Sequence, residues 1–318
     1  MNEIEIKESD LRTLLNSDTT TRDELDKYFE QDPNEPFSQN LRLRDNIKVI
    51  ADEETTLEIS LMGSVISLAN NWARKKRNKK YRQKIKDEPN AIRIMSEGDS
   101  WFQHPHPKVL DIIDQLSNHY PVYCIGSAGD TVRNMFYEGE FLQAMKDESP
   151  KIFLISGGGN DILGDSFRNY LNDAFDAGAP GKMPERFLKE NFQRELDSIG
   201  NIYRVLFEKL KDKPIDVIIH GYDYVIPLDV MDKGWVGRYM IEKKIENKDD
   251  RRAVINYMMD RFNEKLSSIA AEYPNVHYID LRKTVRDDQW FDEIHPTSDG
   301  FQDLALKYHS LIQEIVKK

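Results

Sequence analysis

The chain has 318 residues, of which 39% are hydrophobic, and it carries a formal net charge of −11 at pH 7. A chain of this length can bury a full core and a second, smaller module. The acidic balance excludes a protein that binds nucleic acid over its whole surface, because contacts to phosphate groups need a basic surface. The single cysteine, Cys124, excludes an intramolecular disulfide, and its apolar neighbours predict a small buried residue.

The same features predict a cytoplasmic protein. The first residues, Met1 to Ile6, have neither the basic start nor the apolar run of a secretory signal. No uninterrupted apolar stretch approaches the ~20 residues that a membrane-spanning helix needs. A lone cysteine also places no demand on an oxidising compartment.

Charge divides the N-terminal part of the chain. Residues 1–70 contain 7 Lys and Arg against 16 Asp and Glu, whereas residues 71–90 contain 9 against 2. This shift predicts a boundary near residue 90, with a mainly helical N-terminal extension over residues 1–90 whose role the sequence leaves open. Within the extension, Thr21 to Glu24 match a capping box, which predicts the start of a short helix.

A second helix is predicted from Leu57 to Trp72 and onward into a basic segment, Arg74 to Lys86. Cations at the C-terminal end of a helix are favoured by its macrodipole. One interpretation of the basic segment is a solvated helix packed on the main domain by its apolar side chains. The other is a surface that contacts a protein, a membrane surface or a polyanion.

Residues 91–318 show short β-rich runs that alternate with segments of helical periodicity. This alternation is typical of a doubly wound parallel sheet with helices on both faces. The five predicted strands are Ile92–Met95, Val122–Ile125, Ile152–Ser156, Ile215–His220 and Val276–Ile279. The predicted fold is therefore a three-layer α/β/α domain over residues 91–318.

Chemically informative residues follow four of these strands. In such a sheet, ligands bind beyond the carboxyl ends of the strands, so segments at those ends should meet at one edge. The segments are Gly98-Asp99-Ser100 after the first strand, Gly129 after the second, Gly157 to Asp161 after the third, and Asp292 to His295 after the fifth.

Two of these segments contain the residue types of nucleophilic catalysis. Ser100, at a strand-to-helix turn, can expose its hydroxyl for attack, and His295 can accept the proton. Asp292 precedes His295 by three residues, so a single turn can direct its carboxylate to the imidazole. Each residue alone is also what a helix cap or an exposed turn would contain. Their combination predicts a serine hydrolase.

The remaining segments suit an oxyanion hole. Backbone amides of Ser100 and Gly129 and the side-chain amide of Asn160 can donate hydrogen bonds to a negatively charged oxygen. One neutral donor of this kind is typically worth a factor of about 10²–10³ in rate. Three successive glycines before Asn160 favour access to the backbone over packing. The run has neither the Lys-Ser/Thr ending of a phosphate loop nor dinucleotide-binding spacing.

Three further histidines fall near these segments. His104 and His106 follow Ser100, and His220 ends the fourth predicted strand. Each either lines the pocket or is an ordinary loop or strand residue. No cysteine and histidine cluster has the spacing of metal ligands, so neither a metal nor a cofactor is predicted.

In their order and spacing, the four segments resemble the SGNH, or GDSL-type, hydrolases, whose blocks carry Ser, Gly, Asn and His. The resemblance covers residues 91–318 and implies a flavodoxin-like fold. It implies Ser100 as the nucleophile, His295 as the base and Asp292 as the residue that orients it. It also implies an oxyanion hole made by Ser100, Gly129 and Asn160.

The resemblance further implies a metal-independent esterase or lipase that forms an acyl-enzyme. The substrate is expected to be a small-molecule, lipid or carbohydrate acyl ester, with its acyl group and alcohol left open. Trp101 stands where the family's short name has leucine, and together with Phe102 it is expected to narrow the pocket. Residues 229–250, with Trp235, Tyr239 and Met240, are interpreted as an insertion that can act as a lid.

An alternative interpretation is a non-catalytic binding or scaffold protein on a hydrolase fold. In that case the N-terminal region would recruit a partner or a membrane surface. The alternative is weakened because every catalytic position is filled, whereas loss of catalysis would let at least one of them change.

Overall fold

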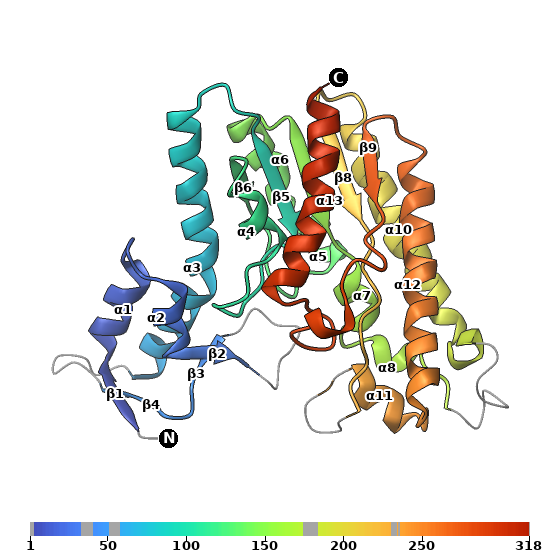
Figure 1. Ribbon diagram of the computed structural model, residues 1–318, viewed down its shortest axis with the longest axis horizontal. Helices are drawn as coiled ribbons and strands as arrows, with labels where there is room; N and C mark the ends of the chain where they lie inside the picture. Colours follow the sequence, from blue (N-terminus) through green and yellow to red (C-terminus); the bar gives the residue numbers. More distant parts are fainter. Residues whose placement is uncertain are drawn as a thin grey trace.

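The computed structural model describes residues 3–32, 41–50, 58–173, 184–229, 234 and 236–317, with residues 58–67, 70 and 138 described by their backbone alone. A central parallel sheet has the strand order β6-β5-β7-β8-β9 (Figure 1). Its strands are β5 (Ile94–Gly98), β6 (Val122–Cys124), β7 (Ile152–Ser156), β8 (Asp216–His220) and β9 (Val276–Ile279). All four pairings are parallel, as predicted.

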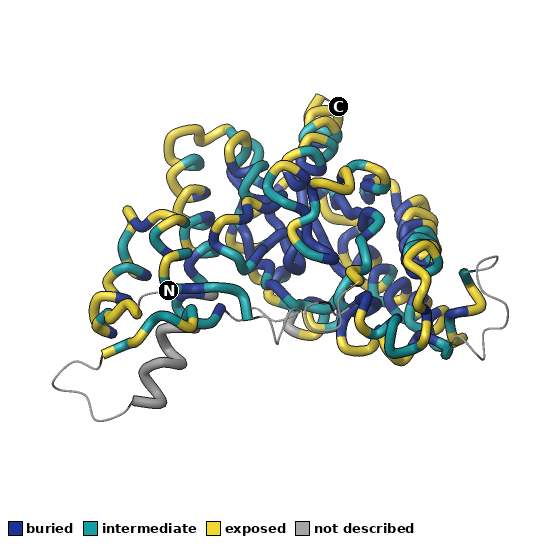
Figure 2. The backbone as a smooth tube through the Cα atoms, turned by 60° about the horizontal axis from the view of Figure 1, so that its bottom comes forward, coloured by how far each residue is buried: buried dark blue, intermediate teal, exposed yellow. Residues whose placement is uncertain are grey.

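The central strands are buried on both faces. β5 and β7 are buried at every position, which explains why their sequences do not alternate between apolar and polar residues. In Figure 2 the buried backbone gathers at the centre of this part of the molecule, and exposed segments lie on the outer helices. The core is therefore built on the sheet, and the carboxyl ends of its strands are held rigidly.

Helices cover both faces of the sheet. Because parallel crossovers are right-handed, the reversal of direction after β6 places α4 on one face and the later crossover helices on the other. α13 packs against α4, and α10 packs against α12. The helices of this domain are α4 (Ile112–Leu116), α5 (Val132–Glu138), α6 (Glu140–Glu148), α7 (Gly159–Leu163), α8 (Phe167–Tyr170), α10 (Glu190–Leu210), α11 (Val236–Glu242), α12 (Lys248–Ala270) and α13 (Ser298–Val316).

The N-terminal extension contains strands as well as the predicted helices. Its helices are α1 (Glu8–Asn16), α2 (Arg22–Asp26) and α3 (Glu58–Asp87), and its strands are β1 (Ile4–Lys7), β2 (Phe29–Gln31), β3 (Leu41–Leu43) and β4 (Ile47–Ile50). β1 pairs with β4 in parallel, and β2 pairs with β3 antiparallel. Strands of three or four residues are too short to leave a clear alternating pattern, so the sequence analysis did not predict them. The predicted capping box is present at the start of α2.

The long helix α3 covers the edge of the central sheet beside β6 (Figure 1). The side-chain amide of Asn78 donates to the Cys124 carbonyl at 2.9 Å, and the Cys124 N–H donates to the Asn78 oxygen at 2.8 Å. An uncovered edge strand would leave backbone groups unpaired and open to association. The extension therefore completes the edge of the α/β domain, in addition to having a small core of its own around Leu11, Phe29 and Trp72.

Candidate active site

Three residues from two segments that are distant in sequence form a hydrogen-bonded chain at the carboxyl edge of the sheet. Ser100 Oγ lies 2.7 Å from His295 Nε2, and His295 Nδ1 lies 2.7 Å from Asp292 Oδ2. Ser100 is 7% exposed and His295 is 1% exposed. The structure thus brings together the three residues for which the sequence predicts the roles of nucleophile, base and orienting acid.

Asp292 is held by the turn that it shares with His295. Its Oδ1 accepts the N–H groups of Ile294 at 2.9 Å and His295 at 2.7 Å. One carboxylate oxygen therefore fixes the turn while the other contacts the imidazole. The geometry is local, which is why a spacing of three residues was an informative signal.

A buried network fixes the turn that carries Ser100. Asp99 accepts the Trp101 N–H at 3.0 Å and the Ser156 hydroxyl at 2.9 Å, and the Tyr222 hydroxyl donates to its other oxygen. Burial raises the pKa of Asp99, and these donors oppose that rise. Sequence reasoning missed Ser156 and Tyr222 in this role. The available signal was that both are polar residues at or just beyond the carboxyl ends of predicted strands.

The residues predicted for the oxyanion hole follow three different strands, and the segments of Gly129 and Asn160 contact each other. Asn160 Nδ2 donates to the Asp130 carbonyl at 2.8 Å, next to Gly129. Gly129 has φ +80°, a conformation that glycine adopts without strain. Among the described residues, the backbone N–H groups of Ser100 and Gly129 and the second N–H of the Asn160 amide have no acceptor. Three donors therefore remain for a ligand.

The glycine run before Asn160 has a packing reason that the sequence did not reveal. Gly158 has φ +103°, and a Cβ there would lie 2.7 Å from the ring of Phe262. A Cβ on Gly159 would lie 2.8 Å from the ring of Tyr222. Two of the glycines are thus required by the close approach of aromatic rings, beyond any need for access to the backbone.

Trp101 does not narrow a pocket, contrary to the expectation from its position after Ser100. It is 2% exposed, and its indole N–H donates to the Ile294 carbonyl at 3.0 Å. Phe102 is fully buried as well. Through this hydrogen bond, Trp101 links the turn of Ser100 to the turn of His295. Its large ring packs in the core and does not narrow a pocket.

The three additional histidines have different environments. The His104 ring stands perpendicular to the His295 ring with centroids 4.7 Å apart. Burial, followed by the nearby His295, holds the pKa of His104 well below its usual value. His106 lies further out, with its ring 5.0 Å from that of Phe291. His220 is fully buried in the core, and burial lowers its pKa to about 4.

His104, Asp292 and His295 offer ligand atoms within 4.8 Å of one another, which is close enough for a metal ion. Both nitrogens of His295 are already directed at Asp292 and Ser100. His104 Nδ1 accepts the His106 N–H at 3.1 Å, which leaves the proton on Nε2. A protonated nitrogen is not a metal ligand, so the hydrogen bonds present favour the hydrogen-bonded network over a metal site.

Glu293 anchors the predicted insertion to the turn of His295. Its carboxylate is fully buried and accepts the N–H groups of Leu228 and Gly237 at 2.7 Å and of Val236 at 2.8 Å. A negative charge is favoured at this position because α11 begins there. Within the insertion, Met240 is buried and Tyr239 packs against the core, whereas Trp235 lies outside the described residues. A lid role for residues 229–250 stays a prediction.

Most cations of the basic segment make contacts within the chain. Arg77 is buried between Asp111 and Asp114, and Arg82 pairs with Glu148. Lys76 lies 4.6 Å from the centroid of the Trp72 ring, and Lys80 and Lys84 both donate to Asn118. These contacts favour the interpretation of a helix packed on the main domain. No helix in the described part of the chain combines the length and apolarity needed to cross a membrane.

The family model for GDSL-like lipases and acylhydrolases matches residues 97–302. The match includes Ser100, Gly129, Asn160, Asp292 and His295. The chain therefore belongs to the GDSL-like lipase/acylhydrolase family, and it is an enzyme that hydrolyses ester bonds.

Solved structures of similar fold include an acetylxylan esterase from Geobacillus stearothermophilus and a GDSL-like lipase from Bacteroides thetaiotaomicron. The acetylxylan esterase is 18% identical with a TM-score of 0.42, and the match covers 69% of this chain and 93% of that one. The lipase is 14% identical with a TM-score of 0.42, and the match covers 74% of this chain and 98% of that one. A search of curated protein sequences found no match.

Proposed function

We propose that the protein is a metal-independent serine esterase that works through an acyl-enzyme on Ser100. The observation that carries this proposal is the chain of two contacts of 2.7 Å from Ser100 through His295 to Asp292. In the first step, Ser100 Oγ attacks the carbonyl carbon of the ester, and its proton passes to His295 Nε2. Asp292 stabilises the imidazolium that forms and holds the ring in place.

The negative charge on the carbonyl oxygen is stabilised by the N–H groups of Ser100 and Gly129 and by Asn160. His295 then donates its proton to the leaving alcohol as the carbon–oxygen bond breaks, and the acyl group stays on Ser100. In the second half, His295 removes a proton from water, and the hydroxide attacks the acyl carbon. Return of the proton to Ser100 releases the acid and restores the enzyme.

The proposed substrate is a small-molecule, lipid or carbohydrate acyl ester. The proposed location is the cytoplasm, which is compatible with Cys124, a buried cysteine without a disulfide partner. The dependence of the hydrolysis rate on the length of the acyl chain will show which acyl groups the enzyme accepts.

The test is hydrolysis of p-nitrophenyl acetate, butyrate and octanoate by the wild type and by Ser100→Ala, with and without EDTA. We expect turnover that EDTA does not change and that Ser100→Ala abolishes. Ser310→Ala removes a hydroxyl from the exposed face of α13 and serves as the matched control. Full activity in Ser100→Ala would refute the mechanism.

A fluorophosphonate probe separates a selective enzyme from a scaffold. Labelling of wild type but not of Ser100→Ala, without turnover of the three esters, would indicate a reactive serine with a narrow substrate range. Absence of labelling in folded protein would favour the non-catalytic alternative.

A further inference from the structure

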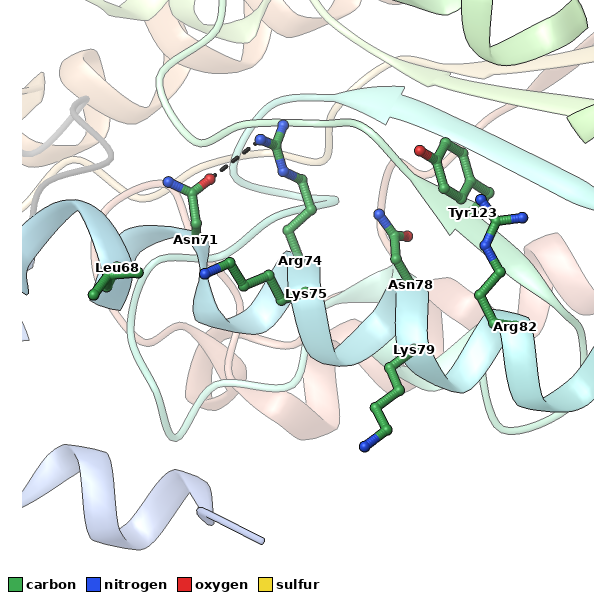
Figure 3. Close-up of a pocket in the computed structure, with 8 residues that line it drawn as sticks. All are labelled: Leu68, Asn71, Arg74, Lys75, Asn78, Lys79, Arg82 and Tyr123. Atoms are coloured by element: carbon green, nitrogen blue, oxygen red, sulfur yellow. Dashed lines mark hydrogen bonds between the residues drawn. The ribbon is translucent and has the colours of Figure 1, made fainter. Parts of the chain in front are cut away.

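A basic groove lies along α3 next to the edge strand β6 (Figure 3). It has a volume of about 700 Å³ and is lined by Leu68, Asn71, Arg74, Lys75, Asn78, Lys79, Arg82 and Tyr123. Four of these lining residues are cations and none is an acid. This composition is unusual in a chain with a net charge of −11, and it indicates a local site for negative charge.

The cations of the groove differ in how far they are neutralised. Arg82 is paired with Glu148, and Lys79 pairs with Asp18 and points away from β6 in Figure 3. Among the described residues, Arg74 and Lys75 have no carboxylate within 4.0 Å. Within the described part of the chain, these two side chains therefore have no ion-pair partner in direct contact, and Arg74 has a longer-range charge interaction with the buried Glu97.

Arg74 is held in a fixed orientation. Its guanidinium donates to the Asn71 side-chain oxygen at 3.2 Å and to the Ile125 carbonyl at 3.4 Å, and Figure 3 shows the first of these contacts. An arginine that is oriented in advance loses little conformational entropy when it binds an anion, and its planar fork suits phosphate, sulfate and carboxylate.

One end of the groove lies near loops of the candidate active site. Asn71 and Arg74 also line a second, smaller hollow together with Gln103, Pro105 and residues 126–128. Gln103 and Pro105 belong to the loop that follows Ser100, and residues 126–128 lead directly into Gly129. The end of the basic groove at Asn71 and Arg74 therefore lies beside the loop that follows Ser100 and the segment that leads into Gly129.

We propose that this groove binds an anionic group of the ester substrate, so that the enzyme prefers esters that carry a phosphate, sulfate or carboxylate. The inference rests on the proposed esterase function. A long polyanion would be repelled by the acidic remainder of the surface, whereas a small anionic group needs only the local cluster around Arg74 and Lys75.

The test compares an anionic with a neutral trisaccharide ester, both acetylated on the ring hydroxyls: acetylated trigalacturonate and acetylated galactotriose. Acetate release gives kcat/KM for wild type, for Arg74→Gln/Lys75→Gln, and for the control Lys213→Gln. Lys213 is exposed and lies before β8, which is separated from β6 by β5 and β7 in the sheet. We expect wild type and Lys213→Gln to have a higher kcat/KM for the anionic ester than for the neutral one. In the double variant, the ratio of these two kcat/KM values should fall by about tenfold or more, which corresponds to the loss of one charge-assisted hydrogen bond.

Binding of inorganic pyrophosphate, measured by calorimetry, tests the groove without turnover. We expect binding to wild type and to Lys213→Gln, and at least a tenfold weaker affinity in the double variant. No preference of wild type for the anionic ester, or a preference that survives in the double variant, would overturn the proposal. Binding of oligo(dT) or phosphatidylglycerol vesicles that depends on Arg74 and Lys75, with ester selectivity unchanged, would also overturn it in favour of a docking surface.

Failure of the proposed function gives a different result. A wild-type protein that hydrolyses neither ester and takes no fluorophosphonate label would refute the esterase and, with it, the assignment of the groove to an ester substrate. A labelled enzyme that hydrolyses both trisaccharides equally would leave the esterase intact and refute only the anionic preference.

Discussion

Replacement of Arg77 by leucine tests whether the N-terminal extension supports the candidate active site. Arg77 belongs to α3, and its side chain is 3% exposed. Its guanidinium donates to the Phe102 carbonyl and the Gln103 side-chain oxygen at 2.7 Å, to Asp114 at 2.9 Å, and to Asp111. These partners lie in the loop that follows Ser100 and at the start of the helix after it, so Arg77 joins the extension to the surroundings of Ser100.

The expected loss of stability follows from what Arg77→Leu leaves behind. The side chain of Asp111 is fully buried and would lose its cation, whereas Asp114 would keep its contact with Arg22. Asp111 would keep the backbone N–H groups of His104, Ile113 and Asp114 as donors. Removing one partner of a buried ion pair costs about 3–5 kcal/mol, because the remaining charge stays buried without its counter-ion. Domains are typically stable by only about 5–15 kcal/mol, so this loss is a large fraction of the total.

The assay is urea unfolding, which gives the free energy of unfolding, combined with the rate of fluorophosphonate labelling in native buffer. We expect a loss of about 3–5 kcal/mol and slower labelling in Arg77→Leu. Arg77→Lys keeps the charge without the planar fork and should lie in between. The exposed pair of Arg194 with Glu190 is the control, and Arg194→Leu should cost about 0.5 kcal/mol or less. A loss below about 1 kcal/mol with unchanged labelling would refute the reasoning.

Three further predictions concern the candidate site and the core. Asn160→Ala should lower kcat by about 10²–10³ while the protein stays folded by circular dichroism, and an unchanged kcat would exclude Asn160 from the oxyanion hole. Glu293→Ala should lower the free energy of unfolding by several kcal/mol, because the buried N–H groups of Val236 and Gly237 and the part-buried N–H of Leu228 lose a charged acceptor; urea unfolding equal to wild type would contradict this. Burial lowers the pKa of His220 from 6.5 to about 4 in the folded protein. As the pH falls from 6.5 to about 4, the unfolded chain therefore binds a proton at His220 before the folded protein does, and the free energy of unfolding decreases. His220→Phe should remove about 3 kcal/mol of this acid sensitivity in unfolding measured at pH 7 and pH 4, and an identical pH dependence in both proteins would show that His220 does not cause it.

The local sequence pattern was sufficient to predict the central sheet and the order of the segments that form the candidate site. β7 and β9 have the boundaries that were predicted. β5 was predicted at Ile92–Met95 and extends over Ile94–Gly98. Ser96 and Glu97 look like loop residues, yet both are buried because β5 lies between β6 and β7. The position of a strand in the sheet is information that its own sequence does not contain.

The sequence by itself determined the family, the parallel sheet and the residues Ser100, Asp292 and His295, because each depends on short spacings or on the order of strand ends. Only the tertiary structure decided that Tyr222 supports Asp99, that Trp101 packs inward, and that Arg77 ties the extension to the loop after Ser100. These contacts join residues between 25 and 193 positions apart. No local periodicity can encode them, since they arise only when the strands and helices have packed and buried polar groups must find their partners.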